Sequence, residues 1–108
     1  MTEFTSNESL TIDIADDGAV VVHGDIDMAG GPILEAVLRP REGTDAVLID
    51  LADVSFIDSS GLRSLLDAAR RAHARGTEVV LRSVGPEVSR LLEITGTSEQ
   101  FRIDGRRD

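Results

Sequence analysis

Two adjacent serines, Ser59 and Ser60, stand between an acidic residue and a glycine in the segment Asp58-Ser59-Ser60-Gly61. A stretch with helical periodicity follows at once, so both hydroxyls fall at the start of a predicted helix. A hydroxyl there can cap the helix by accepting a hydrogen bond from a free backbone N–H group. It can also accept a phosphoryl group, because the positive end of a helix dipole favours the negative charge of a phosphate. The motif alone permits either role, and Gly61 is equally consistent with close backbone packing.

Phosphorylation changes the charge of the surface around the serine pair. A phosphoserine carries about −1.5 to −2 charges at neutral pH, and the side chains of Asp27 and Asp58 are expected nearby. One repulsion between like charges about 6 Å apart amounts to about 2–4 kcal/mol before screening, at an effective dielectric constant near 20. A difference of that size weakens binding roughly a hundredfold. The serine pair therefore predicts a switch that alters partner binding and leaves the fold unchanged.

Serine hydrolysis is the enzymatic alternative, and it requires a base within reach of the hydroxyl. His73 lies 14 residues from Ser59 along the predicted helix, which is roughly 20 Å at about 1.5 Å per residue. His23 ends a neighbouring strand, where a structural role is the usual one. The chain has no Cys, two His, and no nucleotide-binding or nucleophile-elbow motif. We therefore predict that the protein is not an enzyme and uses neither metal nor cofactor.

The spacing of apolar residues predicts the elements that position the serine pair. Residues 10–14 alternate apolar and polar side chains, and residues 16–18 supply a turn, so residues 10–14 and 19–23 are expected to pair as an antiparallel hairpin. Residues 46–51 form a continuous apolar run, which is typical of a strand covered on both faces. The other predicted elements are helices at 32–40, 62–76 and 86–96, strands at 78–82 and 101–103, and loops at 24–31 and 54–61.

The order β-β-α-β-α-β-α-β predicts an α/β fold, with helices packed on a mixed, mostly parallel sheet that begins with an antiparallel hairpin. Functional loops in such sheets lie at the carboxyl ends of the strands. The two predicted loops there contain Asp25, Asp27 and Asp58, and Asp53 immediately precedes the second loop. We expect a single domain over residues 1–108, with an ordered core at about residues 10–103 and frayed ends at 1–9 and 105–108.

Composition and charge exclude several classes of partner. The chain has 108 residues, of which 41% are hydrophobic and 29% charged, as is typical of a folded globular domain. Its net charge of −9 opposes phosphate backbones and anionic lipids, so we expect neither nucleic acid nor membrane as a partner, but a basic protein surface. The sequence opens with no secretory signal, and its apolar runs are far shorter than the ~18 residues of a membrane helix. These features predict a cytoplasmic protein.

Four segments of the sequence resemble the signature of the STAS domain, and in particular that of bacterial anti-sigma factor antagonists. The longest is residues 50–62 (DLADVSFIDSSGL). The others are residues 24–28 (GDIDM) with Pro32, Gly85-Pro86 with residues 90–92 (RLL), and residues 94–96 (ITG). The resemblance extends over about residues 10–103, and several motifs in the right order are more specific than any one of them.

The resemblance implies a role for the residues around the serine pair. It implies that Ser59 is the phosphorylated residue and that Ser60 is the helix cap or a minor acceptor. Asp27 matches an acidic residue of the family that lies near the serine and helps to contact the kinase. The surface expected to contact the partner consists of Asp25, Asp27, Asp58, Ser59, Ser60, Gly61 and Arg63.

The resemblance also implies a mechanism. The unphosphorylated protein binds an anti-sigma factor, which frees the sigma factor. The anti-sigma factor is itself an ATP-dependent serine kinase that phosphorylates Ser59 and releases the product, and a metal-dependent serine phosphatase restores the binding form. The alternative within the same fold is a STAS module that serves a transporter, a lipid-trafficking complex or a multi-protein sensor. One departure, Gly30-Gly31 where the family often has a hydroxyl residue before Pro32, predicts a weaker cap on the first helix.

Overall fold

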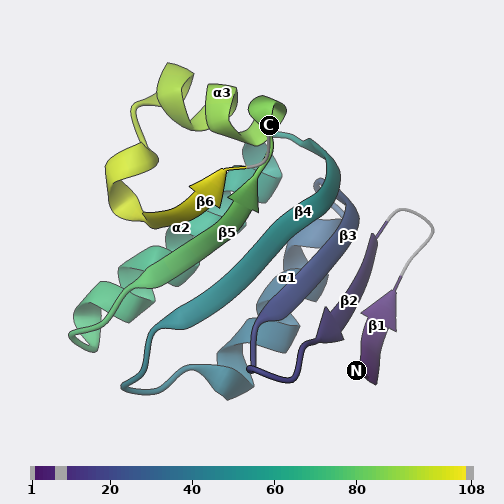
Figure 1. The fold of residues 1–108 in the computed structure, drawn as a ribbon, viewed down its shortest axis with the longest axis vertical. Coiled ribbons are helices and arrows are strands. Elements are labelled where there is room, and N and C mark those ends of the chain that lie inside the picture. Colours follow the sequence, from purple (N-terminus) through teal and green to yellow (C-terminus); the bar gives the residue numbers. More distant parts are fainter. Residues whose placement is uncertain (1, 7–9, 107–108) are drawn as a thin grey trace.

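The computed structural model describes residues 2–6 and 10–106, and within them six strands form one sheet (Figure 1). The strands lie side by side in sequence order. The pairs β1–β2 and β2–β3 are antiparallel, whereas β3–β4, β4–β5 and β5–β6 are parallel. The strands are β1 (Thr2–Ser6), β2 (Leu10–Ile14), β3 (Val20–Ile26), β4 (Val47–Ile57), β5 (Val79–Val84) and β6 (Arg102–Arg106).

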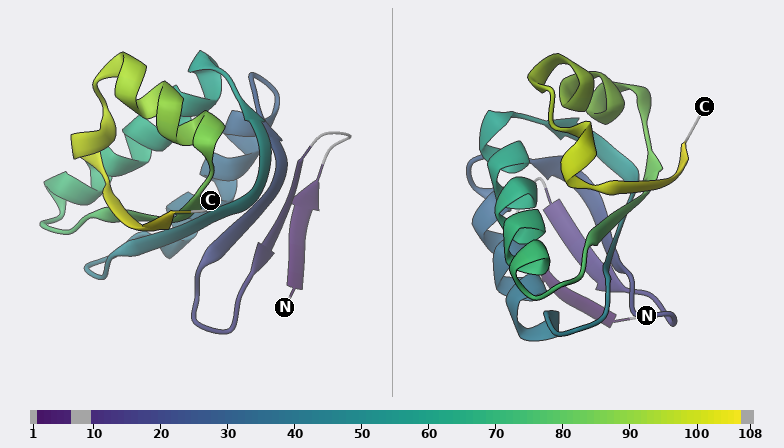
Figure 2. Two further views of the ribbon diagram at one scale, coloured as in Figure 1. Left: turned by 45° about the horizontal axis from the view of Figure 1, so that its top comes forward. Right: turned by 90° about the vertical axis from the view of Figure 1, so that its left-hand side faces the viewer.

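Two helices lie side by side against one face of the sheet, and a third lies at the end where β4 and β5 finish (Figure 2). The first two are α1 (Gly30–Leu38) and α2 (Ser59–Ala74), and the third is α3 (Pro86–Thr95). Two short 3-10 turns follow α1 and α3, at Arg39–Arg41 and Ser98–Gln100. Among the described residues, no helix has the length and apolar character needed to cross a membrane.

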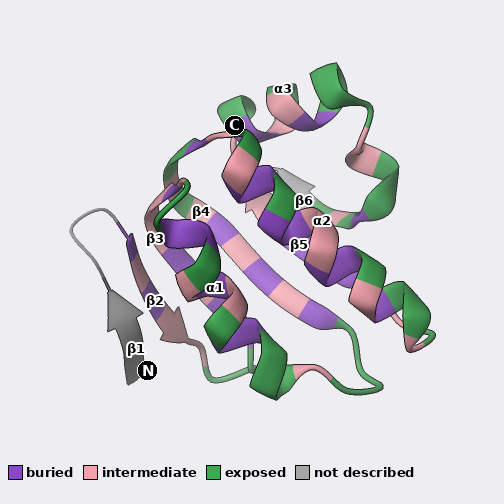
Figure 3. Cartoon of the chain, turned by 180° about the vertical axis from the view of Figure 1, so that it is seen from behind, coloured by how far each residue is buried: buried purple, intermediate pink, exposed green. Residues whose placement is uncertain are grey.

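The hydrophobic core lies between these helices and the sheet. Alternate strand residues such as Val20, Val22 and Ile49 are fully buried there, and the residues between them are half-buried, which produces the bands along β4 in Figure 3. Leu34 of α1 and Leu65 of α2 pack into the same cluster. The predicted α/β class, with an antiparallel start and a parallel remainder, is confirmed.

Strands β3 and β4 continue further than predicted. The sequence predicts loops from residues 24 and 54 onward, but Gly24 pairs with Val54 and the ladder continues as far as Ile26 and Ile57. The pairing shifts register twice along the way, which is typical of β-bulges. A bulge interrupts the alternation of apolar and polar residues, so this part of each strand resembles a loop in sequence.

The ends of the chain also differ from the prediction. Residues 2–6, predicted to be frayed, form β1 against β2. The last strand runs from Arg102 to Arg106, so it begins one residue later and ends three residues later than predicted, while Phe101 is buried beside it. Met1, residues 7–9 and residues 107–108, for which fraying is also predicted, lie outside the described residues.

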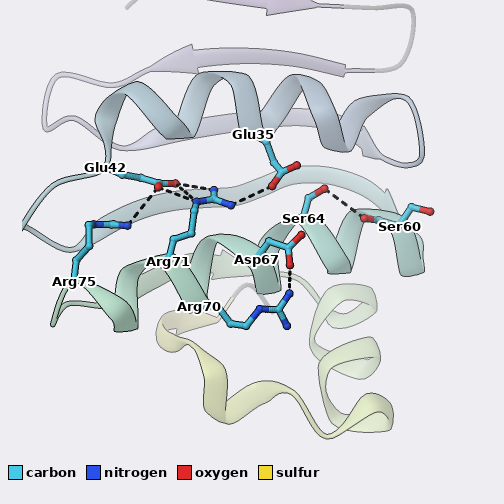
Figure 4. A network of polar contacts seen from close by, with 8 residues as sticks. All are labelled: Glu35, Glu42, Ser60, Ser64, Asp67, Arg70, Arg71 and Arg75. Atoms are coloured by element: carbon cyan, nitrogen blue, oxygen red, sulfur yellow. Dashed lines mark hydrogen bonds and ion pairs between the residues drawn. The ribbon is translucent and has the colours of Figure 1, made fainter.

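A cluster of charged side chains joins the far end of α2 to the segment after α1 (Figure 4). Arg71 donates to both carboxylate oxygens of Glu42, at 2.9 and 2.7 Å, and to Glu35 at 3.2 Å. Arg75 donates to Glu42 at 3.3 Å and to the backbone carbonyl of Gly43 at 2.7 Å. The side chain of Glu42 is only 9% exposed. The hydrogen bonds and charge of Arg71 lower the pKa of Glu42 below its ordinary value.

Replacement of Glu42 by Gln is expected to lower the free energy of unfolding by about 1–3 kcal/mol at pH 7, because Arg71 loses its charged and largely buried partner. The native pKa of Glu42 lies below the unfolded one, so its contribution is present above the unfolded value and is lost as the pH falls. Urea unfolding of the wild type and of Glu42→Gln should therefore show a difference in the free energy of unfolding that becomes smaller below about pH 4.5.

Glu78→Gln is the matched control, because Glu78 forms an exposed ion pair with Arg102 at 3.4 Å. Its effect should stay below about 1 kcal/mol. Equal effects of the two substitutions at pH 7 would show that the Glu42 cluster does not stabilise the fold.

Candidate functional site

Asp58 caps α2, and this leaves the adjacent serine hydroxyls unused as caps. The Asp58 carboxylate accepts a hydrogen bond from the backbone N–H of Gly61 at 2.9 Å, and its carbonyl accepts from Leu62 at 2.9 Å. The prediction that Ser60 is the cap is therefore wrong, since a carboxylate one residue before the serine pair already serves the first turn. The exposed hydroxyl of Ser59 has no hydrogen-bond partner among residues 10–104.

A carboxylate also accepts backbone hydrogen bonds in the loop after β3. The Asp27 carboxylate accepts from the backbone N–H groups of Gly30 at 2.7 Å and Ala29 at 3.1 Å, and the Asp27 carbonyl accepts from Gly31 at 2.8 Å. As predicted, the residue before α1, Ala29, gives the helix no side-chain cap. The Asp27 carboxylate instead holds the turn that leads into the helix. Asp27 and Asp58 thus have the same local role, each bonding to a glycine three residues later.

Glycines allow both helix starts to pack against the end of β3. A Cβ atom on Gly61 would lie 2.0 Å from the carbonyl oxygen of Ile26, and one on Gly30 would lie 2.8 Å from the carbonyl oxygen of Asp25. The backbone N–H of Asp58 also donates to the Ile26 carbonyl at 3.3 Å. The loop after β3 and the first turn of α2 are therefore held against the same stretch of backbone.

A surface hollow of about 360 Å³ lies where these two segments meet. Met28, 76% exposed, and Pro32 line it from the α1 side. Its remaining lining residues come from the first two turns of α2, namely Ser59, Ser60, Arg63 and Ser64. The hydroxyl of Ser64 donates to the Ser60 carbonyl at 3.4 Å (Figure 4). We call this feature the serine hollow.

Three of the seven predicted site residues line the serine hollow, and the others lie in the segments next to it. Ser59, Ser60 and Arg63 line it, whereas Asp58 and Gly61 belong to the same helical turn and are engaged in capping and packing. Asp27 immediately precedes Met28, and half-buried Asp25 lies within β3, where its carbonyl faces Gly30. The sequence analysis missed Met28, Pro32 and Ser64 as site residues. Met28 and Pro32 belong to one of the segments that resemble the family signature, but nothing in the sequence places them at a surface hollow.

The two histidines are not associated with this hollow. His23, on β3, contacts carboxylates on both neighbouring strands, Asp53 at 2.9 Å through Nδ1 and Asp13 at 3.1 Å through Nε2. Both ring nitrogens are therefore occupied, and neither is placed to activate Ser59. His73 is exposed near the opposite end of α2. Among the described residues, no three His, Asp or Glu side chains are grouped so that they could hold a metal ion.

A second, larger hollow of about 510 Å³ lies between the end of β4 and the start of α3. Phe56, which is 48% exposed, lines it together with Asp53 and Glu87. Neither Ser59 nor Ser60 lines this larger hollow, and the serine that does, Ser55, lies within β4. The position of Ser59 at the start of a helix makes the serine hollow the better candidate site.

Comparison with known protein families agrees with this arrangement of motif and fold. A family model described as STAS domain matches residues 8–107, which is nearly the whole chain. The chain belongs to the STAS domain family.

The relatives of this STAS domain include proteins named as anti-sigma factor antagonists. The anti-sigma-B factor antagonist of Staphylococcus aureus (strain NCTC 8325 / PS 47) is 31% identical over 87 residues, covering 79% of this chain and 81% of the relative. An anti-sigma factor antagonist from Mycobacterium paratuberculosis matches with a TM-score of 0.71 at 29% identity, over 93% of this chain and 89% of that one. Bacillus SpoIIAA in its phosphorylated form shares the fold, with a TM-score of 0.64 at 18% identity over 89% and 91% of the two chains.

Replacement of Gly61 by Ala is expected to destabilise this STAS domain by about 3 kcal/mol, because the new methyl group overlaps a backbone carbonyl that cannot move aside cheaply. Thermal or urea unfolding measures the change. Gly43→Ala is the control, since a Cβ atom there meets nothing within 4 Å, and its effect should stay within about 0.5 kcal/mol. If Gly61→Ala is as stable as Gly43→Ala, the proposed contact between α2 and β3 does not constrain the site.

Proposed function

We propose that this STAS domain is an anti-sigma factor antagonist controlled by phosphorylation of Ser59. In this proposal the unphosphorylated form binds an anti-sigma factor that is also an ATP-dependent serine kinase, and phosphorylation of Ser59 ends the binding. The observation that carries the proposal is the state of the Ser59 hydroxyl. Ser59 is exposed at the serine hollow, and its hydroxyl has no hydrogen-bond partner within residues 10–104, because Asp58 caps the helix in its place.

The position of Ser59 suits a modification that leaves the fold intact. Ser59 is the first residue of α2, a helix of 16 residues, so a phosphate there lies near the positive end of the helix dipole. No hydrogen bond within residues 10–104 depends on its hydroxyl. Phosphorylation therefore removes no contact that holds α2 to the sheet.

The surroundings of Ser59 explain why a phosphate would stop a partner from docking. Met28 offers an exposed apolar side chain in the hollow, and a partner that covers it must exclude water from the hollow. A phosphate at the rim makes that exclusion costly, because a buried charge without a counter-ion is strongly unfavourable. The carboxylates of Asp27 and Asp58 in the adjacent turns add repulsion of the same sign.

The proposed partner surface retains the residues predicted from the sequence and adds Met28 at its centre. Gly61 is buried, so its contribution is to position the turn that carries Ser59. Partner contacts then come from Asp25, Asp27, Asp58, Ser59, Ser60 and Arg63. A metal-dependent serine phosphatase resets the switch, and the protein acts in the cytoplasm with no catalysis of its own. The names of the Staphylococcus and Mycobacterium relatives support this assignment.

Calorimetry with a candidate anti-sigma factor of the same organism tests the proposal. The unmodified protein and Ser59→Ala should bind alike, whereas protein with phosphoserine at position 59 should bind roughly a hundredfold more weakly. The side chain of Met28 supplies a second readout. The sequence has two methionines, so ¹³C-methyl labelling gives two signals, and that of Met28 should shift when the partner binds.

Kinase labelling provides the control for the assignment of the site. With ATP, the anti-sigma factor should phosphorylate the wild type and Ser60→Ala at Ser59, as located by mass spectrometry, and Ser59→Ala should stay bound. Label outside Ser59 and Ser60, or equal affinities with and without phosphate, would contradict the proposal. Absence of binding in both states would favour the alternative, a STAS module that serves a transporter, a lipid-trafficking complex or a sensor.

A further inference from the structure

Arg63 is an exposed arginine of α2 that forms no ion pair within residues 10–104. It lines the serine hollow, one helical turn after Ser59. Most other arginines in this part of the chain contact a carboxylate, and these are Arg70, Arg71, Arg75, Arg82 and Arg102. The lack of an ion pair at Arg63 within residues 10–104 therefore requires a physical explanation.

Arg63 does not pair with the carboxylate that lies four residues later on the same helix. Asp67 stands at that spacing on the same helix, yet it contacts Arg70 instead (Figure 4). The choice follows a general preference, because an acid placed before a base along a helix forms the better pair and agrees with the helix dipole. For Arg63, the favourable position for an acid is four residues earlier, and Ser59 occupies that position.

We propose that Arg63 is the counter-ion of phosphorylated Ser59 within the same helix. The proposal rests on Ser59 being the phosphorylated residue, and it adds how the phosphate is held. Side chains four residues apart lie on one face of a helix, with Cβ atoms about 5–6 Å apart. Helical side chains also lean toward the N-terminus, so the long Arg63 side chain can extend back over Ser59. Its planar guanidinium group matches the oxygens of a phosphate.

This pairing gives phosphorylation a second effect beyond repulsion. In the unmodified protein the Arg63 guanidinium is available to an acidic group of the partner at the rim of the hollow. Phosphorylation gives Arg63 an internal partner and fixes both groups above Met28 and Pro32, which line the hollow from the other side. The modified protein thus loses a binding contact and covers the apolar surface at the same time.

Phosphorus NMR of protein with phosphoserine inserted at position 59 during translation tests the pairing. The second pKa of the phosphate should be about half a unit higher in Arg63→Ala than in the wild type, because the dianion loses its counter-ion. Arg63→Lys should give an intermediate pKa, since lysine keeps the positive charge but lacks the planar guanidinium group that can bond two phosphate oxygens at once. Asp27 and Asp58 raise the same pKa in every variant, so the comparison between variants isolates Arg63.

Arg39→Ala is the matched control. Arg39 is also exposed, but it follows the last turn of α1, at the end away from the serine hollow. In Arg39→Ala, the second pKa of the phosphate at position 59 should equal that in the wild type. Equal pKa values in the wild type and Arg63→Ala, with both proteins folded by circular dichroism, would overturn the inference. Because the phosphoserine is inserted without a kinase, this result is independent of whether an anti-sigma factor binds or phosphorylates the protein.

Discussion

The position of the serine pair depends on the close approach of the first turn of α2 to the end of β3. The Ile26 carbonyl leaves no room for a side chain at position 61, and it also accepts a hydrogen bond from the backbone of Asp58. The serine pair therefore lies on a turn whose position is set by strand backbone and not by flexible side chains. The same end of β3 leads into the loop that carries Met28, so one contact fixes both walls of the serine hollow.

The residue that caps α2 and the proposed phosphorylation site are neighbours in the sequence. Asp58 satisfies the first turn of the helix, so Ser59 can gain or lose a phosphate without affecting that hydrogen bond. Much of the charge that stabilises the packing of the helices lies elsewhere, where Arg71 and Glu42 join the far end of α2 to the segment after α1. A change of charge at the serine hollow is thus remote from the ion pairs that hold the fold.

Periodicity and turn residues were sufficient to predict the class of the fold, the three helices and the central strands. They did not predict that Gly24 and Val54 pair, because bulged strands lose the alternation on which such predictions depend. At the site, the sequence singles out Ser59 as the acceptor but does not show that Met28 lines the same hollow, because the two residues lie about 30 positions apart in the chain. It also assigned the cap to Ser60, because Asp and Ser are equally good caps and only the backbone geometry decides between them.

The account depends on a phosphate at Ser59 altering the surface and leaving the fold unchanged. Amide NMR spectra of the protein with serine and with phosphoserine at position 59 test this most directly. The account predicts shifts confined to the first two turns of α2 and to the loop around Met28, with the signals of β4, β5 and the far end of α2 unchanged. Shifts spread through the sheet, or a loss of signal dispersion, would contradict it.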